Sequence, residues 1–168
     1  LSNSKSQNEL STLFCTNKNQ EKYLTINEAY TETLATIFNC IFVSLEQSKK
    51  QLYQTFIKYL NTEREYSCHM TKKILHYYNY KSYNEILKKD NCLPFQQNTN
   101  VLSYYIIKCC FLININDFIE YLEKSKTIVS NNDDIFVILQ KTVYINDIIA
   151  KIQLSLYLDN SMRMTCIE

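Results

Sequence analysis

The amino-acid sequence predicts an all-α fold, a disulfide-stabilised helical bundle with room for two similar helical halves packed together. Glycine is absent from its 168 residues, and helices need glycine less than tight β-turns do. Ser or Thr followed three residues later by Glu or Gln recurs along the chain, which is the capping-box pattern of helix starts. Apolar residues recur at intervals of three and four, the period of a buried helix face.

The first half of the chain begins with a helix that we expect to start at Thr25, where Thr25 and Glu28 form a capping box. Further capping boxes at Ser48, Thr62 and Ser82 predict further starts, unless two of them fall inside longer helices. Without glycine, the C-terminal caps must use Asn or polar side chains. The first helix has an apolar stripe that we expect to face the core, formed by Leu34, Ile37, Phe38, Ile41, Phe42 and Leu45.

The second half follows Pro94, the only proline, which lies in a polar stretch and marks the best boundary between the halves. Helix is expected from about Val101, with an interruption near Asn114–Asn116 where Asn116 can cap a new start. One last long helix should follow Asn132 and a tail should be held by Cys166. Its predicted stripe is Ile135, Ile138, Leu139, Ile145, Ile148, Ile149 and Ile152. The expected parts are an N-terminal segment over 1–24, a first half over 25–90 and a second half over 91–168, as one compact domain or two small repeats.

The cysteines indicate the cellular compartment of the protein. None shows the paired CxxC or CxxH spacing of zinc sites, so we interpret them as disulfide candidates, which favours a secreted, extracellular protein over a reduced cytosolic one with buried thiols. A chain that starts at Leu1 rather than Met is also expected of a mature protein after signal-peptide removal. Seven cysteines leave one without a partner, and their spacing does not determine connectivity. They are Cys15, Cys40, Cys68, Cys92, Cys109, Cys110 and Cys166.

The same composition argues against catalysis. Phosphate-binding loops, dinucleotide fingerprints and nucleophile elbows all need glycine, so we predict no enzyme activity and no cofactor. His69 and His76, with Cys68 adjacent, lack the further ligands that a zinc site requires. Asp133 and Asp134 are better explained by a helix N-terminus than by acid-base chemistry. A net charge of +1 gives no excess of positive charge for binding nucleic acid. The sequence contains no apolar run of 18 residues, so we predict no membrane insertion.

Each half presents a cysteine, a tyrosine and a second cysteine, followed by a Phe-Ile-x-Tyr-Leu string. The first set is Cys15, Tyr30 and Cys40, and the second is Cys92, Tyr105 and Cys109. Paired motifs of this kind in a small secreted chain resemble the bicycle family of aphid salivary effectors. The resemblance implies a protein delivered with saliva into host plant tissue, with Tyr30 and Tyr105 as the motif tyrosines.

The preferred functional hypothesis is therefore a secreted, non-enzymatic effector that binds a host protein through exposed Tyr and Phe side chains. One alternative is a helical carrier that encloses a small apolar ligand, as odorant-binding proteins do. Another is a different secreted host-modulating helical protein, derived from a parasite or a virus. The sequence identifies neither the host partner nor the oligomeric state.

Overall fold

The computed structural model describes residues 10–14, 16, 24–47, 49–87, 95, 97–124, 132–152 and 166. Its largest feature is an antiparallel hairpin of two long helices, α2 (Ile26–Gln47) and α3 (Leu52–Tyr77), joined through the 3₁₀ turn η2 (Lys49–Gln51). The described residues contain no strand beyond two isolated bridges, Phe14 with Leu87 and Thr16 with Phe95. The all-α prediction is confirmed.

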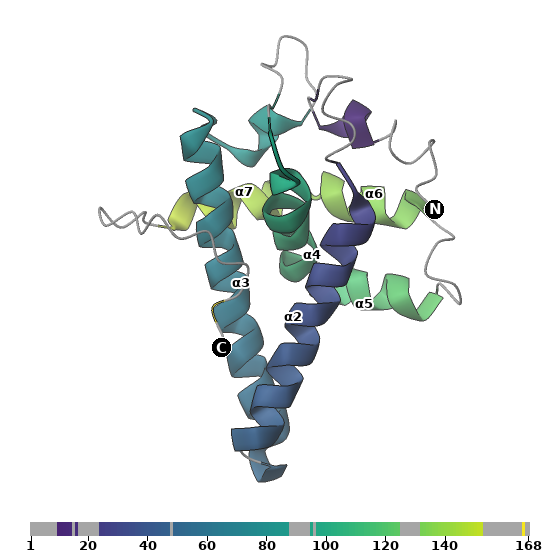
Figure 1. The fold of residues 1–168 in the computed structure, drawn as a ribbon, viewed down its shortest axis with the longest axis vertical. Helices are drawn as coiled ribbons and strands as arrows, with labels where there is room; N and C mark the ends of the chain where they lie inside the picture. Colours follow the sequence, from purple (N-terminus) through teal and green to yellow (C-terminus); the bar gives the residue numbers. More distant parts are fainter. Residues whose placement is uncertain are drawn as a thin grey trace.

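The hairpin opens like a V, and the remaining helices lie between and beside its upper arms, while its tip projects away from them (Figure 1). The π-helical segment η4 (Leu102–Ile107) continues into α4 (Lys108–Ile113), and together they pack against both α2 and α3. Every residue of α4 is buried. The apolar run that the sequence shows from Val101 onward is thus the central helix of the fold.

Helix α5 (Ile115–Lys124) follows α4 after a bend of 90° at Asn114, which confirms the predicted interruption. The prediction that Asn116 caps the new helix was wrong, because Asn116 lies inside α5. The bend is local, because Asn114 leaves the helical conformation with a ψ of 44°. Its side-chain amide donates to the Cys110 carbonyl at 2.9 Å. Among the described residues, no single helix is long and apolar enough to cross a membrane. By length and composition alone, the bent pair Leu102–Ile113 with Ile115–Glu123 would qualify.

The last helical region is divided, and the prediction of one long helix was wrong. Helix α6 (Asn132–Gln140) ends before Lys141, and α7 (Thr142–Lys151) begins after it. Helix α6 packs against α4 and α5, whereas α7 packs against α3 and the 3₁₀ turn η3 (Tyr83–Ile86). The predicted stripe is nevertheless buried or half-buried throughout.

The capping box at Thr25 marks the start of α2 correctly, although its hydrogen bonds differ from the pattern. The Thr25 backbone N–H donates to Ser103 Oγ at 3.0 Å. Glu28 accepts from the Asn100 side-chain amide instead of folding back on Thr25. Both bonds join the start of α2 to the segment before α4. Ser48 lies outside the described residues, and helix resumes just after it with η2.

The capping box at Thr62 does not start a helix, because Thr62 lies inside α3 and its hydroxyl donates to the Lys58 carbonyl at 3.1 Å. Ser82 does precede a helical turn, η3, but makes no side-chain capping bond there. Glu85 accepts from the Lys81 backbone N–H at 2.8 Å. Among the described residues, the capping-box pattern thus marks two true helix starts, at Thr25 and Ser82, and one false start, at Thr62.

Helix α3 ends at Tyr77, and Asn79, two residues further on, has a φ of 61°. The Asn79 N–H donates to the His76 carbonyl at 3.0 Å, and the Tyr80 N–H donates to the Leu75 carbonyl at 2.8 Å. These two bonds form a Schellman motif, which needs a left-handed residue where glycine is usual. The expectation that Asn would replace glycine at a helix end is confirmed here.

The core is one hydrophobic cluster that draws on both predicted halves. Leu10 and Phe14 from the N-terminal segment, Leu75 from the first half and Phe118 and Ile149 from the second all belong to it. The aromatic rings of Phe111 and Phe118 stack at 5.0 Å near its centre.

Candidate functional site

Helix α2 turns a different face to the core from the one predicted. Its buried residues step by three and four, but they are mostly small or polar: Ala29, Thr33, Thr36, Cys40 and Ser44. Small side chains let α2 approach α3 closely, and their hydroxyls are satisfied within the helix. Thr33 donates to the Ala29 carbonyl at 2.7 Å and Ser44 to the Cys40 carbonyl at 2.6 Å.

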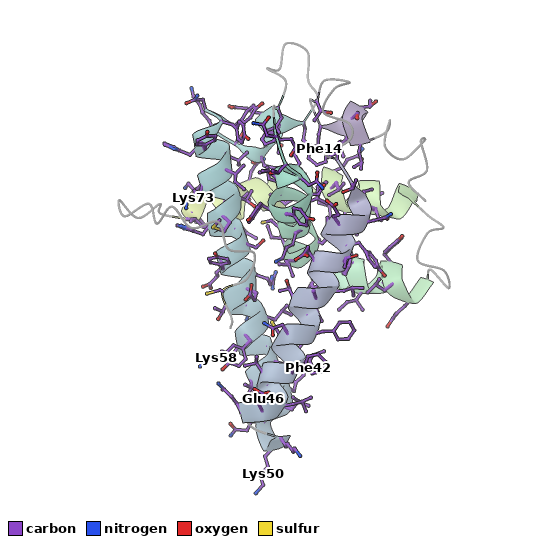
Figure 2. All side chains as sticks on the ribbon, in the orientation of Figure 1. Phe14, Phe42, Glu46, Lys50, Lys58 and Lys73 are labelled. Atoms are coloured by element: carbon purple, nitrogen blue, oxygen red, sulfur yellow. The ribbon has the colours of Figure 1, made fainter. Side chains whose placement is uncertain are left out.

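The predicted core stripe is consequently wrong for three of its residues, Phe38, Phe42 and Leu45. Leu34 and Ile37 are half-buried against the core, as expected. Phe38 is 52% exposed, Phe42 61% and Leu45 37%. These three residues, at positions i, i+4 and i+7, form the α2 stripe. Figure 2 shows Phe42 on the part of the hairpin that projects beyond the other helices.

The two rings of the α2 stripe lie together. Phe38 and Phe42 stack with ring centroids 6.4 Å apart and an interplanar angle of 24°. Glu46, Lys49 and Lys50 are exposed just beyond Leu45 at the hairpin tip. The stripe is thus an apolar surface beside a tip that carries more positive than negative charge.

Two residues of opposite charge are buried on α3 and α4. Lys108 is 2% exposed and Glu63 is 1% exposed. Burial lowers the pKa of Lys108, while the carboxylates of Glu63 and Glu32 act to raise it. Glu63 also accepts from the Cys166 backbone N–H at 2.8 Å. The predicted anchoring at Cys166 is therefore made by its backbone, because its side chain is exposed as a free thiol.

The described cysteines are thiols, so the predicted disulfide staples are absent among them. Cys40, Cys68, Cys109 and Cys110 are buried, and Cys166 is exposed. Cys15 and Cys92 lie outside the described residues. The nearest approach recorded between sulfur atoms is 3.7 Å, from Cys68 to Cys109, which is longer than a disulfide bond.

Burial changes the acidity of these thiols. Desolvation, assisted by the Glu63 carboxylate, raises the pKa of Cys40 from 9.0 to about 11. Desolvation also raises the pKa of Cys110, whose thiol lies 3.3 Å from the Tyr83 hydroxyl. Thiols that keep their protons are poor nucleophiles. Cys40 and Cys110 therefore serve packing.

The motif tyrosines take part in packing and do not meet in one site. Tyr30 on α2 contacts Phe118 on α5, with ring centroids 5.6 Å apart. Tyr105 in η4 is half-buried against the core, and its carbonyl accepts from the Thr71 hydroxyl at 3.3 Å. Burial raises the pKa of both phenols. The first cysteine of each motif lies outside the described residues, so the structure places only the tyrosine and the second cysteine of each.

No group of three or more His, Cys, Asp or Glu side chains in the described part of the chain could hold a metal ion. His69 is half-buried and His76 is exposed, both on α3. The side chains of Asp133 and Asp134 lie outside the described residues.

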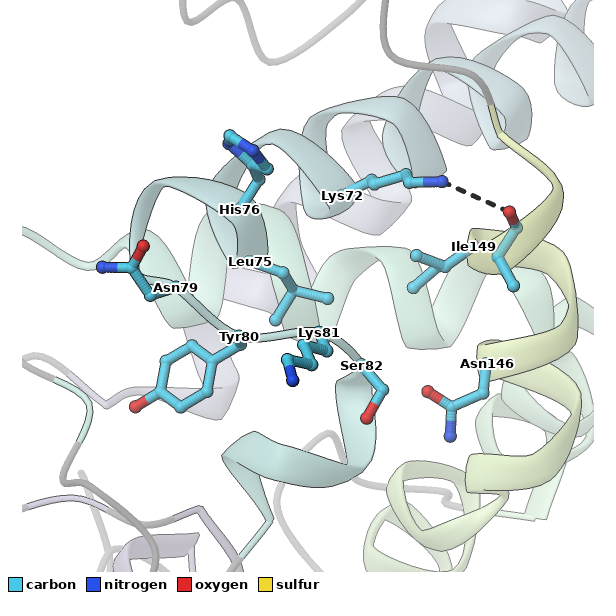
Figure 3. A pocket seen from close by; sticks show the side chains of 10 residues that line it. Lys72, Leu75, His76, Asn79, Tyr80, Lys81, Ser82, Asn146 and Ile149 are labelled. Carbon is cyan, nitrogen blue, oxygen red and sulfur yellow. Dashed lines mark hydrogen bonds between the residues drawn. The ribbon is translucent and has the colours of Figure 1, made fainter.

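A cavity of about 750 Å³ lies where the end of α3 meets the following turn and α7. Leu75 and Ile149 form its apolar part, while Lys72, Lys81 and Asn146 bring polar groups to its wall (Figure 3). Lys72 Nζ donates to the Ala150 carbonyl at 3.3 Å and also to that of Ile152, so it caps the end of α7. The cavity is partly open to solvent. Its full lining is Lys72, Leu75, His76, Asn79, Tyr80, Lys81, Ser82, Asn146, Ile149 and Ala150.

Comparison with known proteins gives one relative of note. The chain is 31% identical over 121 residues to an uncharacterized protein of Acanthamoeba polyphaga mimivirus, which is 69% of this chain and 32% of the viral protein. The chain thus spans about a third of the length of that relative. No protein-family model matches the chain. No solved structure matches it.

Proposed function

We propose that this chain is a non-enzymatic protein-binding module that acts on a host protein through the α2 stripe. The observation that carries the proposal is the exposure of Phe38, Phe42 and Leu45 on one face of a helix that buries its small residues instead. Aromatic side chains dominate protein-binding energetics, and i, i+4 and i+7 anchors are the usual form of helix-in-groove recognition.

The size of the stripe favours a groove on another protein over a second copy of this chain. Phe38 and Phe42 are 52% and 61% exposed, so together their rings offer roughly 200 Å² of apolar surface. A stable dimer needs about 800 Å² from each partner. A short helical face is sufficient for binding, however, when the partner offers a concave apolar groove that surrounds it.

The charges beside the stripe specify the partner further. Lys49 and Lys50 are exposed at the hairpin tip, and Glu46 is the acidic side chain between them and Leu45. We therefore expect an apolar groove with acidic side chains at the end that receives the tip. Such charges would increase the association rate and fix the direction in which α2 enters the groove.

The similarity to a mimivirus protein supports the virus-derived form of the host-modulating hypothesis. Secretion and the resemblance to aphid salivary effectors stay predictions. The carrier alternative has less support, because the cavity beside α7 is open to solvent and has lysine side chains on its wall.

The proposal can be tested by photo-crosslinking in host cells. A photoreactive phenylalanine analogue replaces Phe42 in one protein and Val137 in a matched control, since Val137 on α6 is also exposed, at 56%. We expect a discrete crosslinked host protein from position 42 that is absent from position 137. Equal crosslinking from both positions, or none from position 42, would contradict binding through the α2 stripe.

A further inference from the structure

We propose that Cys68 and Cys109 are a site of reversible oxidation, where a hydroperoxide converts the two thiols into a disulfide that joins α3 to α4. The two sulfur atoms lie 3.7 Å apart, although the residues are 41 positions apart in the sequence. A disulfide bond is about 2.05 Å long, so each sulfur needs to move by less than about 1 Å.

The pairing is selective, although Cys110 is the next residue after Cys109. The Cys110 thiol lies 3.3 Å from the Tyr83 hydroxyl, on the side of α4 where Tyr83 is fully buried. Cys109 instead meets α3, where the Ser67 and Thr71 hydroxyls also contact its sulfur. The helix geometry therefore assigns Cys109, and not its neighbour, to Cys68.

The surroundings give the two thiols different roles. The hydrogen bond with Cys68 lowers the pKa of Cys109 against the opposing effect of burial, and Thr71, Ser67 and the Lys108 ammonium lower it further. The same hydrogen bond and burial raise the pKa of Cys68. Cys109 is thus the thiolate that attacks the peroxide, and Cys68 is the thiol that then attacks the oxidised Cys109 sulfur.

The reaction takes two steps. The Cys109 thiolate attacks one oxygen of hydrogen peroxide, the O–O bond breaks and Cys109 becomes a sulfenic acid. The hydroxide that leaves takes up the proton that Cys109 had released and becomes water. Cys68 then gives up its proton and attacks the Cys109 sulfur, so the S–S bond forms as the S–O bond breaks and water leaves. In total, two thiols are oxidised and one peroxide is reduced to two waters.

Access to the pair requires local opening, because Cys68 is 2% exposed and Cys109 is fully buried. Hydrogen peroxide is close to water in size, so a brief separation of α3 from α4 admits it. We therefore expect the oxidation to be slow and to become faster under conditions that loosen the core.

The test uses the full chain, purified with reductant and then treated with hydrogen peroxide. After alkylation of the remaining thiols, peptide mass spectrometry without reductant should find a Cys68–Cys109 linkage that dithiothreitol removes. Cys68→Ala and Cys109→Ala should each abolish it, while the control Cys110→Ala should retain it. Linkage of either residue to another cysteine instead, or thiols that stay reduced, would overturn the proposal.

A second measurement does not depend on any variant. The bond closes a loop of about 41 residues, so oxidation should raise the thermal unfolding midpoint of the wild-type chain by roughly 10 °C. A midpoint that falls or stays the same after complete oxidation would contradict a bond formed within the native packing.

Discussion

Replacing Lys108 with Met should destabilise the fold strongly, because it leaves the Glu63 carboxylate without its buried cationic neighbour. Lys108 and Glu63 are 2% and 1% exposed, so water cannot compensate for the missing charge. Removing one of two opposite charges that interact in a protein interior costs about 3 to 5 kcal/mol. That is at least a fifth of the stability of a typical domain, about 5 to 15 kcal/mol.

The double variant Glu63→Gln with Lys108→Met should recover most of this loss. The glutamine amide would keep the oxygen that accepts from the Cys166 N–H, and no uncompensated charge would be buried. We expect the double variant to cost about 1 kcal/mol, so it should recover roughly 3 kcal/mol of the loss that Lys108→Met causes alone.

The assay is equilibrium urea unfolding at pH 7, followed by far-UV circular dichroism, for the wild type, both single variants and the double variant. A loss below about 1 kcal/mol for Lys108→Met, or a double variant whose loss equals the sum of the single losses, would refute the idea that the two charges stabilise each other in the core.

Three further predictions follow from the same structure. Asn79→Ala should cost about 1 kcal/mol in urea unfolding, because φ at this position is 61°, whereas Asn79→Gly should cost nothing; equal losses would exclude a conformational cause. Burial raises the pKa of Tyr83 well above 10.0, so the unfolded chain loses this proton first and stability falls as pH rises above 10.0. Above that pH the unfolding free energy of Tyr83→Phe should fall less steeply than that of the wild type, and parallel curves would contradict this. Phe42→Ser should change the free energy of unfolding by less than about 0.5 kcal/mol, while Phe118→Ala should lower it by about 3 to 5 kcal/mol. If chemical denaturation gives both variants a similar loss of unfolding free energy, the ring of Phe42 is buried.

Much of the fold could be predicted from local pattern. Thr25 marked the start of α2, Asn114 marked the bend before α5, and the stripe over α6 and α7 was correct. These features depend on neighbouring residues and on helical period, which the sequence states directly. The break at Lys141 was missed because the apolar period continues across it, while Lys141 leaves the helical conformation and its ammonium pairs with Asp117 on α5 at 2.6 Å.

The orientation of α2 could not be predicted in the same way. Periodicity shows that Phe38 and Phe42 share a face, but it does not show whether a neighbouring helix covers that face. A second stripe with the same period, from Ala29 to Ser44, was available in the sequence and consists of small residues that permit close helix packing. That small-residue stripe is the signal that could have identified the core side of α2.

The cysteines show a similar limit. Their number favoured disulfides, but a bond depends on distances between sulfur atoms that belong to different helices. Cys40 and Cys110 occupy core positions where their thiols pack without a bond, whereas Cys68 and Cys109 come close only because α3 and α4 pack together there. The pairing is a property of tertiary structure.

The most direct test of binding through the α2 stripe uses the host protein that crosslinking identifies, purified in its free form. Its dissociation constant is measured for the wild-type chain, the double variant of the stripe and a control variant. Titration calorimetry should give about a 30-fold weaker affinity for Phe38→Ser with Phe42→Ser than for the wild type, the loss of one strong anchoring contact. The control Val137→Ser should bind as the wild type does. Equal affinity for all three forms would contradict the claim that this helix face is the binding site.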